Sequence, residues 1–150
     1  MALRLIVKEG DSILEKPCRK VEVFDEKIHR LLDDMADTMY AANGVGLAGP
    51  QVGVLRRICV IDIGDGIIEL INPVVVETKG ERFAQEGCLS SPGKSGITKR
   101  PQWVRVQYQN RFGEPCEISG EDLLAQALCH EIDHLDGVLF KNHVVQWESR

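Results

Sequence analysis

The sequence predicts one domain of the α+β class, in which small antiparallel or mixed β-sheets pack around a central helix and a second helix lies near the N-terminus. Two segments, residues 25–43 and 119–137, carry apolar side chains at helical spacing. Between them lie short β-branched runs separated by turn residues. Because the helices flank the strands instead of alternating with them, a βαβ architecture is excluded. The 150 residues suffice for a single domain with its own core.

The first helix is expected to begin at Asp25, whose carboxylate can cap the first turn, and to end at Asn43 and Gly44. One face of this helix is apolar, at Ile28, Leu31, Leu32, Met35, Ala36, Met39 and Tyr40. Residues 1–23 show no regular pattern and are expected to form a short arm.

The strands are predicted from short runs rich in β-branched residues. Such runs lie at residues 58–63, 69–71 and 74–78, the last two separated by Pro73. Residues 103–109 alternate apolar and polar side chains, and residues 110–113 then favour a hairpin turn toward a strand at 115–118.

The second helix is expected to begin near Ser119, with Asp122 as its capping-box partner, and to end at Gly137. Its apolar positions are Leu123, Leu124, Ala127 and Leu128. This helix also carries the residues with the clearest chemistry.

Composition excludes several classes of protein. The apolar fraction of 43% and the charged fraction of 27% exclude wholesale disorder. A formal net charge of −5 and an aromatic fraction of 5% argue against a broad nucleic-acid surface. No stretch resembles a membrane span or a signal peptide, and the 5 cysteines give no disulfide framework. We therefore expect a cytoplasmic protein with reduced thiols, without a membrane partner and without a stable nucleic-acid partner.

The segment HEIDH at residues 130–134 is an HExxH motif. His130 and His134 are four residues apart on a helix, so both imidazoles can reach one metal ion. Glu131 can approach a water molecule on that ion. The alternative is that both are surface histidines of an amphipathic helix. However, His130 and His134 continue the apolar stripe of Leu123 and Ala127, which favours a buried site.

A catalytic site of this kind needs a third protein ligand and one open position. A histidine six residues beyond His134 is excluded, because Phe140 stands there. Cys88, in the segment EGCLS at residues 86–90, is the better candidate.

Two other interpretations stay open at this point. A small zinc peptidase would use His143 or Glu148 as the third ligand. A metal-stabilised binding module would close the fourth position, with Cys129 as the nearest candidate.

Three segments together resemble the motifs of peptide deformylases, in the same order: GVGLAGPQ at residues 44–51, EGCLS at 86–90 and HEIDHLDG at 130–137. The resemblance extends from about residue 5 to residue 140. It implies that residues 1–150 form one peptide-deformylase-like catalytic domain. It also implies an activity, the metal-dependent removal of the N-terminal formyl group from formyl-methionyl nascent peptides with release of formate.

The resemblance implies roles for individual residues. The implied metal ligands are Cys88, His130 and His134, with Glu131 as the catalytic acid and base. The side-chain amide of Gln51 and the backbone N–H of Leu89 are the implied donors to the formyl oxygen. The substrate side chain is expected to contact Gly44, Val45, Gly46, Gln126 and Ala127.

The surroundings of the ligands can be assigned in the same way. Glu86 is expected to accept an N–H from a ligand imidazole. Asp133 and Arg100 are expected to brace the helix, although an ordinary surface ion pair explains them equally well. Gly49 and Ser91 depart from the family pattern, which usually has alanine and often an aliphatic residue there, and Gly49 is expected to loosen the backbone around Gln51.

One divalent ion per chain is implied. A thiolate and two imidazoles suit zinc, whereas the resemblance implies Fe²⁺ as the native ion, with Zn²⁺, Ni²⁺ or Co²⁺ in the purified protein. The implied partners are N-formyl-Met nascent peptides, with transient proximity to the ribosome. A long C-terminal helix that contacts the ribosome is not expected after Gly137.

Overall fold

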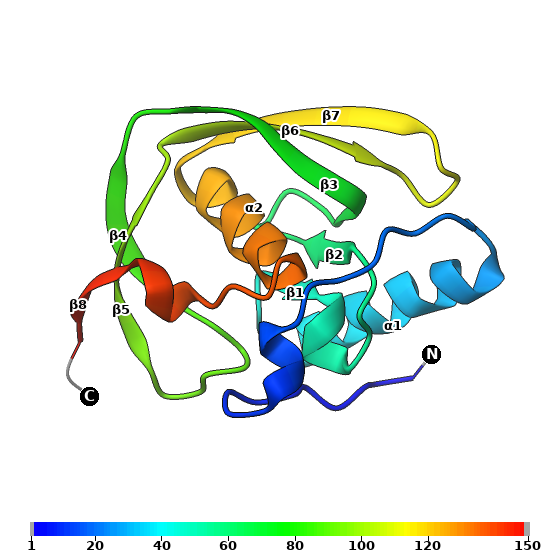
Figure 1. Ribbon diagram of the computed structural model, residues 1–150, viewed down its shortest axis with the longest axis horizontal. Helices are drawn as coiled ribbons and strands as arrows, with labels where there is room; N and C mark the ends of the chain where they lie inside the picture. The colour runs from blue at the N-terminus through cyan, green and yellow to red at the C-terminus, as the bar shows by residue number, and fades with distance from the viewer. Residues whose placement is uncertain (1, 149–150) are drawn as a thin grey trace.

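The helix α2 (Asp122–Leu135) lies between two antiparallel sheets (Figure 1). The computed structural model describes residues 2–148. The other elements in chain order are η1 (Ser12–Glu15), α1 (Glu26–Ala41), β1 (Gly46–Ala48), η2 (Gly49–Val52), β2 (Ile58–Ile61), β3 (Ile68–Lys79), β4 (Arg82–Gly87), β5 (Ser95–Arg100), β6 (Trp103–Gln109), β7 (Pro115–Glu121), η3 (Phe140–His143) and β8 (Val144–Trp147). The α+β class predicted from the sequence is confirmed.

The larger sheet has five strands in the order β1-β2-β3-β6-β7, and the smaller sheet has three in the order β4-β5-β8. Neighbouring strands within each sheet are antiparallel. No helix among the described residues combines the length and the apolar character that crossing a membrane requires.

Strand β2 of the larger sheet packs against both α1 and α2. All four of its residues are buried. Cys59 and Ile61 belong to the core cluster that includes α2 residues, whereas Ile58 and Val60 belong to the cluster that includes α1 residues. Because neighbouring side chains of a strand point to opposite faces, a helix covers each face of this strand. The α2 side of this layered core carries the two histidines.

The first helix and its cap agree with the sequence prediction. Asp25 Oδ1 accepts a hydrogen bond from the Ile28 N–H at 3.3 Å, and α1 ends two residues before Asn43. The strand predicted at residues 103–109 is β6, and the hairpin that follows leads into β7.

Two predicted boundaries were wrong. Ser119 does not begin the second helix, because β7 continues to Glu121, which pairs with Trp103 across the ladder, and α2 begins only at Asp122. Pro73 does not separate two strands. It lies within β3, where the register with β6 shifts between Ile71 and Val74, so the proline is accommodated in a bulge.

Strands β4, β5 and β8 were not predicted. The buried positions of β4 and β5 carry mostly polar side chains instead of an apolar stripe. Glu86 on β4 and Thr98 and Arg100 on β5 are all buried. Alternation of apolar and polar residues therefore cannot reveal these strands, and their polar interior serves the site on α2.

Candidate active site

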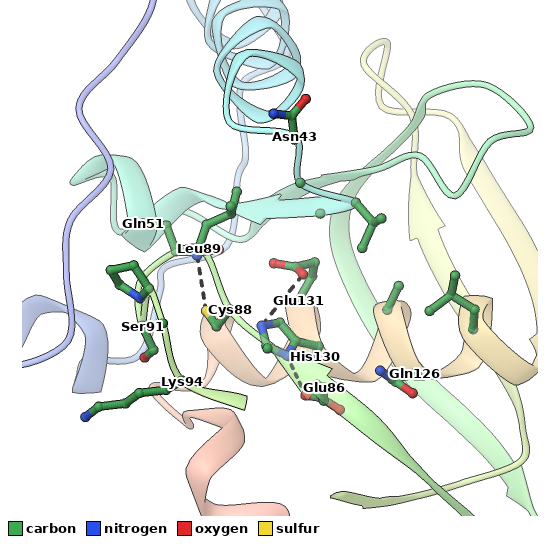
Figure 2. A pocket seen from close by; sticks show the side chains of 18 residues that line it. Asn43, Gln51, Glu86, Cys88, Leu89, Ser91, Lys94, Gln126, His130 and Glu131 are labelled. Atoms are coloured by element: carbon green, nitrogen blue, oxygen red, sulfur yellow. Dashed lines mark hydrogen bonds and ion pairs between the residues drawn. The ribbon is translucent and has the colours of Figure 1, made fainter. Parts of the chain in front are cut away.

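Cys88, His130 and His134 converge on one point, although Cys88 lies more than forty residues before the histidines. One donor atom from each lies within 4.8 Å of the other two, and Cys88 Sγ is 3.4 Å from His134 Nε2. Both histidines stand one turn apart on the buried face of α2, and Cys88 directly follows β4. Figure 2 shows the side chains of Cys88 and His130. The fold thus brings together a thiol and two imidazoles with an orientation that suits one ion.

The donor chemistry fits a divalent transition metal. Thiolate and imidazole are ligands of zinc, iron, nickel and cobalt in proteins. His130 Nδ1 is engaged by Glu86, which leaves Nε2 for a metal. Glu131 Oε1 is buried without a hydrogen-bond partner among residues 2–148, as expected for an oxygen that awaits a water molecule.

The alternative ligands lie elsewhere. His143 Nε2 is 3.0 Å from Asp133 Oδ2 and is not part of the metal-ligand cluster found among the described residues. Cys129 and Glu148 are also outside that cluster. The geometry therefore gives no support to the zinc-peptidase or closed-site interpretations.

Glu86 connects His130 to β5. Its Oε2 lies 2.6 Å from His130 Nδ1 and 2.7 Å from Arg100 Nη2, and its Oε1 accepts from Thr98 Oγ1 at 2.8 Å. Arg100 Nη1 in turn donates to Asp133 Oδ2 at 2.6 Å. The side chains of Arg100 and Glu86 are each 3% exposed and that of Asp133 is 26% exposed, so the predicted ion pair of Arg100 and Asp133 joins a buried carboxylate network to a partly exposed carboxylate.

This environment shifts several pKa values. Burial alone would raise the pKa of Glu86, but the hydrogen bonds from His130 and Arg100 outweigh it and lower the pKa to about 2. Burial raises the pKa of Glu131 to about 7. Burial, together with the charge of His130, lowers the pKa of His134 to about 3, so His134 is neutral and ready to ligate at neutral pH.

His130 behaves differently in the metal-free chain. Burial by itself would lower the pKa of His130, but the charges of Glu131 and Cys88 and the hydrogen bonds that the ring donates to Cys88 and Glu86 outweigh it and raise the pKa well above its ordinary value. A metal ion bound at His130 Nε2 would have to displace this proton, so its binding would weaken in acid.

Gln51 aims its amide at the same point from the opposite side. Its Oε1 accepts the Ala48 N–H at 3.0 Å, which fixes the amide orientation. Its Nε2 then donates to Ser90 Oγ at 3.1 Å and faces Cys88 Sγ at 3.6 Å. Leu89 follows Cys88 in the loop of residues 88–94 and packs against Gly44, where a Cβ would lie 2.5 Å from Leu89 Cδ1.

Comparison with known proteins agrees with this arrangement. A family model described as polypeptide deformylase matches residues 3–150. A peptide deformylase from Acetivibrio thermocellus is 60% identical over 147 residues, which cover 98% of this chain and 86% of that protein. The chain belongs to the polypeptide deformylase family.

Solved deformylase structures share the fold. The crystal structure of a peptide deformylase from Legionella pneumophila is 47% identical, with a TM-score of 0.93 over 95% of this chain and 86% of that one. A peptide deformylase from Synechococcus elongatus in complex with actinonin is 39% identical, with a TM-score of 0.90 over 97% of this chain and 79% of that one. The chain is therefore a metal-dependent enzyme that removes the N-terminal formyl group from nascent formyl-methionyl peptides.

A cavity of about 330 Å³ lies beside Cys88, His130 and Glu131 in this deformylase. The residues predicted to contact the substrate all line it: Gly44, Val45, Gly46, Gln126 and Ala127. At Gly46 a Cβ would lie 2.4 Å from Glu131 Oε2, so the glycine leaves room for the carboxylate. The glycines of the first deformylase motif are thus explained by close approach.

Gly49 differs from the expectation. A Cβ there would lie 2.6 Å from the Val54 carbonyl oxygen and 2.8 Å from that of Arg56. The backbone carbonyl groups of Val54 and Arg56 therefore occupy the space that a methyl group on Gly49 would need. The backbone at Gly49 is tightly packed, whereas the sequence predicted a loosened backbone.

The contacts of the N-terminal arm with the site were not predicted from the sequence. The Val7 N–H donates to the Gln51 carbonyl oxygen and the Glu9 N–H to that of Ser90, each at 2.7 Å. The Glu9 carboxylate accepts from Ser91 Oγ at 3.0 Å and from Lys94 Nζ at 3.2 Å. The arm thus ties the Gln51 turn to the loop that follows Cys88 in this deformylase. No sequence signal marks Glu9, because the arm has no periodic pattern.

Proposed function

We propose that Cys88, His130 and His134 hold one divalent ion in this deformylase and that Glu131 is its general acid and base. The convergence of the three donor atoms within 4.8 Å is the observation that carries the proposal. Glu131 supports it, since its Oε1 is buried without a partner among the described residues and its side chain lines the same cavity as Cys88 and His130.

The chain's own residues account for the proton transfers. A divalent ion bound at this site would act as a Lewis acid and lower the pKa of bound water to roughly 7. Glu131 accepts the proton of the attacking water and later delivers it to the amine nitrogen as the bond between the formyl carbon and that nitrogen breaks. In the metal-free chain burial raises the pKa of Glu131 to about 7, a range that suits both directions of transfer near neutral pH. The products are formate and a free amine.

Gln51 and Leu89 stabilise the charge that develops on the formyl oxygen. The Gln51 amide is fixed by Ala48 before substrate arrives, so it reorganises little during the reaction. The Leu89 backbone N–H donates from the loop that follows Cys88. Removing one donor of this type lowers turnover by about 10²–10³.

The residues around the ligands hold them in place. Glu86 fixes the His130 ring by accepting its Nδ1 hydrogen, and Arg100 together with Asp133 links that carboxylate back to α2. The substrate's methionine side chain lies in the cavity against Gly44, Val45, Gly46, Gln126 and Ala127.

The native ion in this proposal is Fe²⁺, with Zn²⁺, Ni²⁺ or Co²⁺ as substitutes in the purified protein. The mixed thiolate and imidazole set accepts all four. The protein works in the cytoplasm on nascent chains, in transient proximity to the ribosome and without a stable nucleic-acid or membrane partner, as one catalytic domain over residues 1–150. The net charge of −5 supports the absence of a broad nucleic-acid surface.

The test is anaerobic purification with metal analysis, followed by measurement of formate released from a formyl-Met peptide. The proposal predicts one ion per chain, iron as the main metal, and formate release that falls on exposure to air as the Cys88 thiolate oxidises. A chain that releases formate without any bound metal would contradict it.

A further inference from the structure

Gln126 is a polar side chain in an otherwise apolar part of the cavity wall. It lies on α2 one turn before His130 and is 6% exposed (Figure 2). The nearby wall is formed by Val45, Leu123 and Ala127. A buried amide among apolar side chains costs free energy unless its polar atoms find partners.

Two partners hold the Gln126 amide. Its Nε2 donates to the Gln85 carbonyl oxygen at 3.0 Å, and its Oε1 accepts a hydrogen bond from Arg82 Nη1. A glutamine amide carries two N–H groups and two oxygen lone pairs. One N–H of Gln126 therefore has no acceptor among residues 2–148.

Arg82 places a positive charge next to the Gln126 amide. It is half-buried at the start of β4, and no carboxylate of the described residues forms an ion pair with it. A guanidinium stays charged under all ordinary conditions. A charged donor on Oε1 polarises the amide and strengthens its remaining N–H as a donor.

We propose that Arg82, acting through Gln126, makes the side-chain cavity of this deformylase select substrates whose first side chain accepts a hydrogen bond. The inference rests on the proposed placement of the methionine side chain in this cavity. A thioether sulfur is a weak acceptor, and an isosteric methylene is none. A sulfoxide oxygen is a stronger acceptor than either, so the enzyme also deformylates peptides that begin with formyl-methionine sulfoxide. Arg82 is a positioning residue in this account.

The experiment compares kcat/KM for three peptides that differ only in their first residue: formyl-Met, formyl-norleucine and formyl-methionine sulfoxide. Wild-type enzyme is expected to hydrolyse all three. In Arg82→Met, kcat/KM relative to that for formyl-norleucine falls by about tenfold for the sulfoxide peptide and by about threefold for formyl-Met. These factors correspond to the net free energy that one hydrogen bond contributes. The change falls in KM, since the cavity wall does not touch the formyl carbon.

Three further variants complete the design. Arg82→Lys keeps a cation and restores most of the selectivity, and Gln126→Leu removes the donor and abolishes it. Arg30→Met, the same substitution at an exposed arginine on α1, leaves the three values unchanged. Metal content and melting temperature of each variant show that it folds.

Several outcomes would overturn the proposal. Equal losses for the three peptides in Arg82→Met would mean that Arg82 only supports the fold. Failure of the wild type on the sulfoxide peptide alone would show that the cavity does not accept a stronger acceptor. Failure on all three peptides would contradict the proposed function itself, so the two failures are distinguishable.

Discussion

Glu86 Oε2 lies 2.6 Å from His130 Nδ1, and the same carboxylate oxygen lies 2.7 Å from Arg100 Nη2. One carboxylate therefore both orients the imidazole of His130 and neutralises a buried guanidinium. The smaller sheet, which supplies Glu86 and Arg100, thus contributes directly to the candidate metal centre and is not only a support for it.

Glu86→Gln is expected to weaken metal binding by about 10–100-fold, because the amide cannot accept the His130 N–H as strongly as a carboxylate. Metal affinity measured by competition with a chelator checks this. Glu77→Gln, at an exposed carboxylate that pairs with Arg105, is the matched control and should leave the affinity unchanged. An unaltered affinity in Glu86→Gln would refute the role given to this residue.

The same carboxylate makes stability depend on pH. Its folded-state pKa is lowered to about 2 from an ordinary value of 4.5. The folded state therefore holds the proton less tightly than the unfolded state, and the stabilisation is complete above pH 4.5 and lost as pH falls toward 2. Denaturant unfolding of the metal-free chain across this range should show a falling free energy of unfolding. The slope should be smaller in Glu86→Gln, and an identical slope would contradict the assignment.

Glu131→Gln should retain the metal and lose about 10²–10⁴ of turnover, because the amide can neither accept nor deliver the proton. Metal content by elemental analysis and formate release together check this prediction. A variant with wild-type turnover would assign the proton transfers to another group.

Gly46→Ala places a methyl group where the Glu131 carboxylate now lies, since a Cβ would be 2.4 Å from Oε2. Displacement of a catalytic group by about 1 Å can cost roughly 10²-fold in rate. Turnover is expected to fall by that factor with metal retained. Gly87→Ala is the control, because its Cβ would meet only the Lys94 carbonyl oxygen at 3.5 Å, an ordinary contact. Equal losses of turnover in the two variants would contradict this explanation of Gly46.

Glu9→Ala tests the N-terminal arm. Losing the hydrogen bonds to Ser91 and Lys94 should lower kcat by about threefold to tenfold, with little change in metal content. Glu9→Gln keeps an acceptor for Ser91 and should recover part of that loss. The effect arises from the position of the loop that carries Leu89, so KM should change less than kcat. A change confined to thermal stability would show that the arm acts on folding alone.

The sequence reveals those parts of the molecule that follow apolar periodicity. Helix α1 and strand β6 bury a regular stripe, and both were predicted closely. Strands β4 and β5 were missed because their inward positions are given to Glu86, Thr98 and Arg100. These buried positions are polar, so the pattern of hydrophobic residues does not mark them.

The residues of the candidate site could likewise be predicted only in part. Spacing within α2 reveals His130 and His134, since both lie on one helix. Cys88 could be chosen only through its resemblance to a known motif, because a lone cysteine is more often a small core residue. Glu9 and Arg82 act through contacts with residues more than forty positions away in the chain, which local sequence does not encode.

X-ray absorption at the metal edge of the anaerobically purified enzyme tests the central claim most directly. The account predicts one sulfur scatterer at about 2.3 Å and two imidazole nitrogens at about 2.0–2.1 Å if zinc is loaded, with the sulfur signal lost in Cys88→Ser. A spectrum without a sulfur neighbour in the wild type would contradict the proposed ligands.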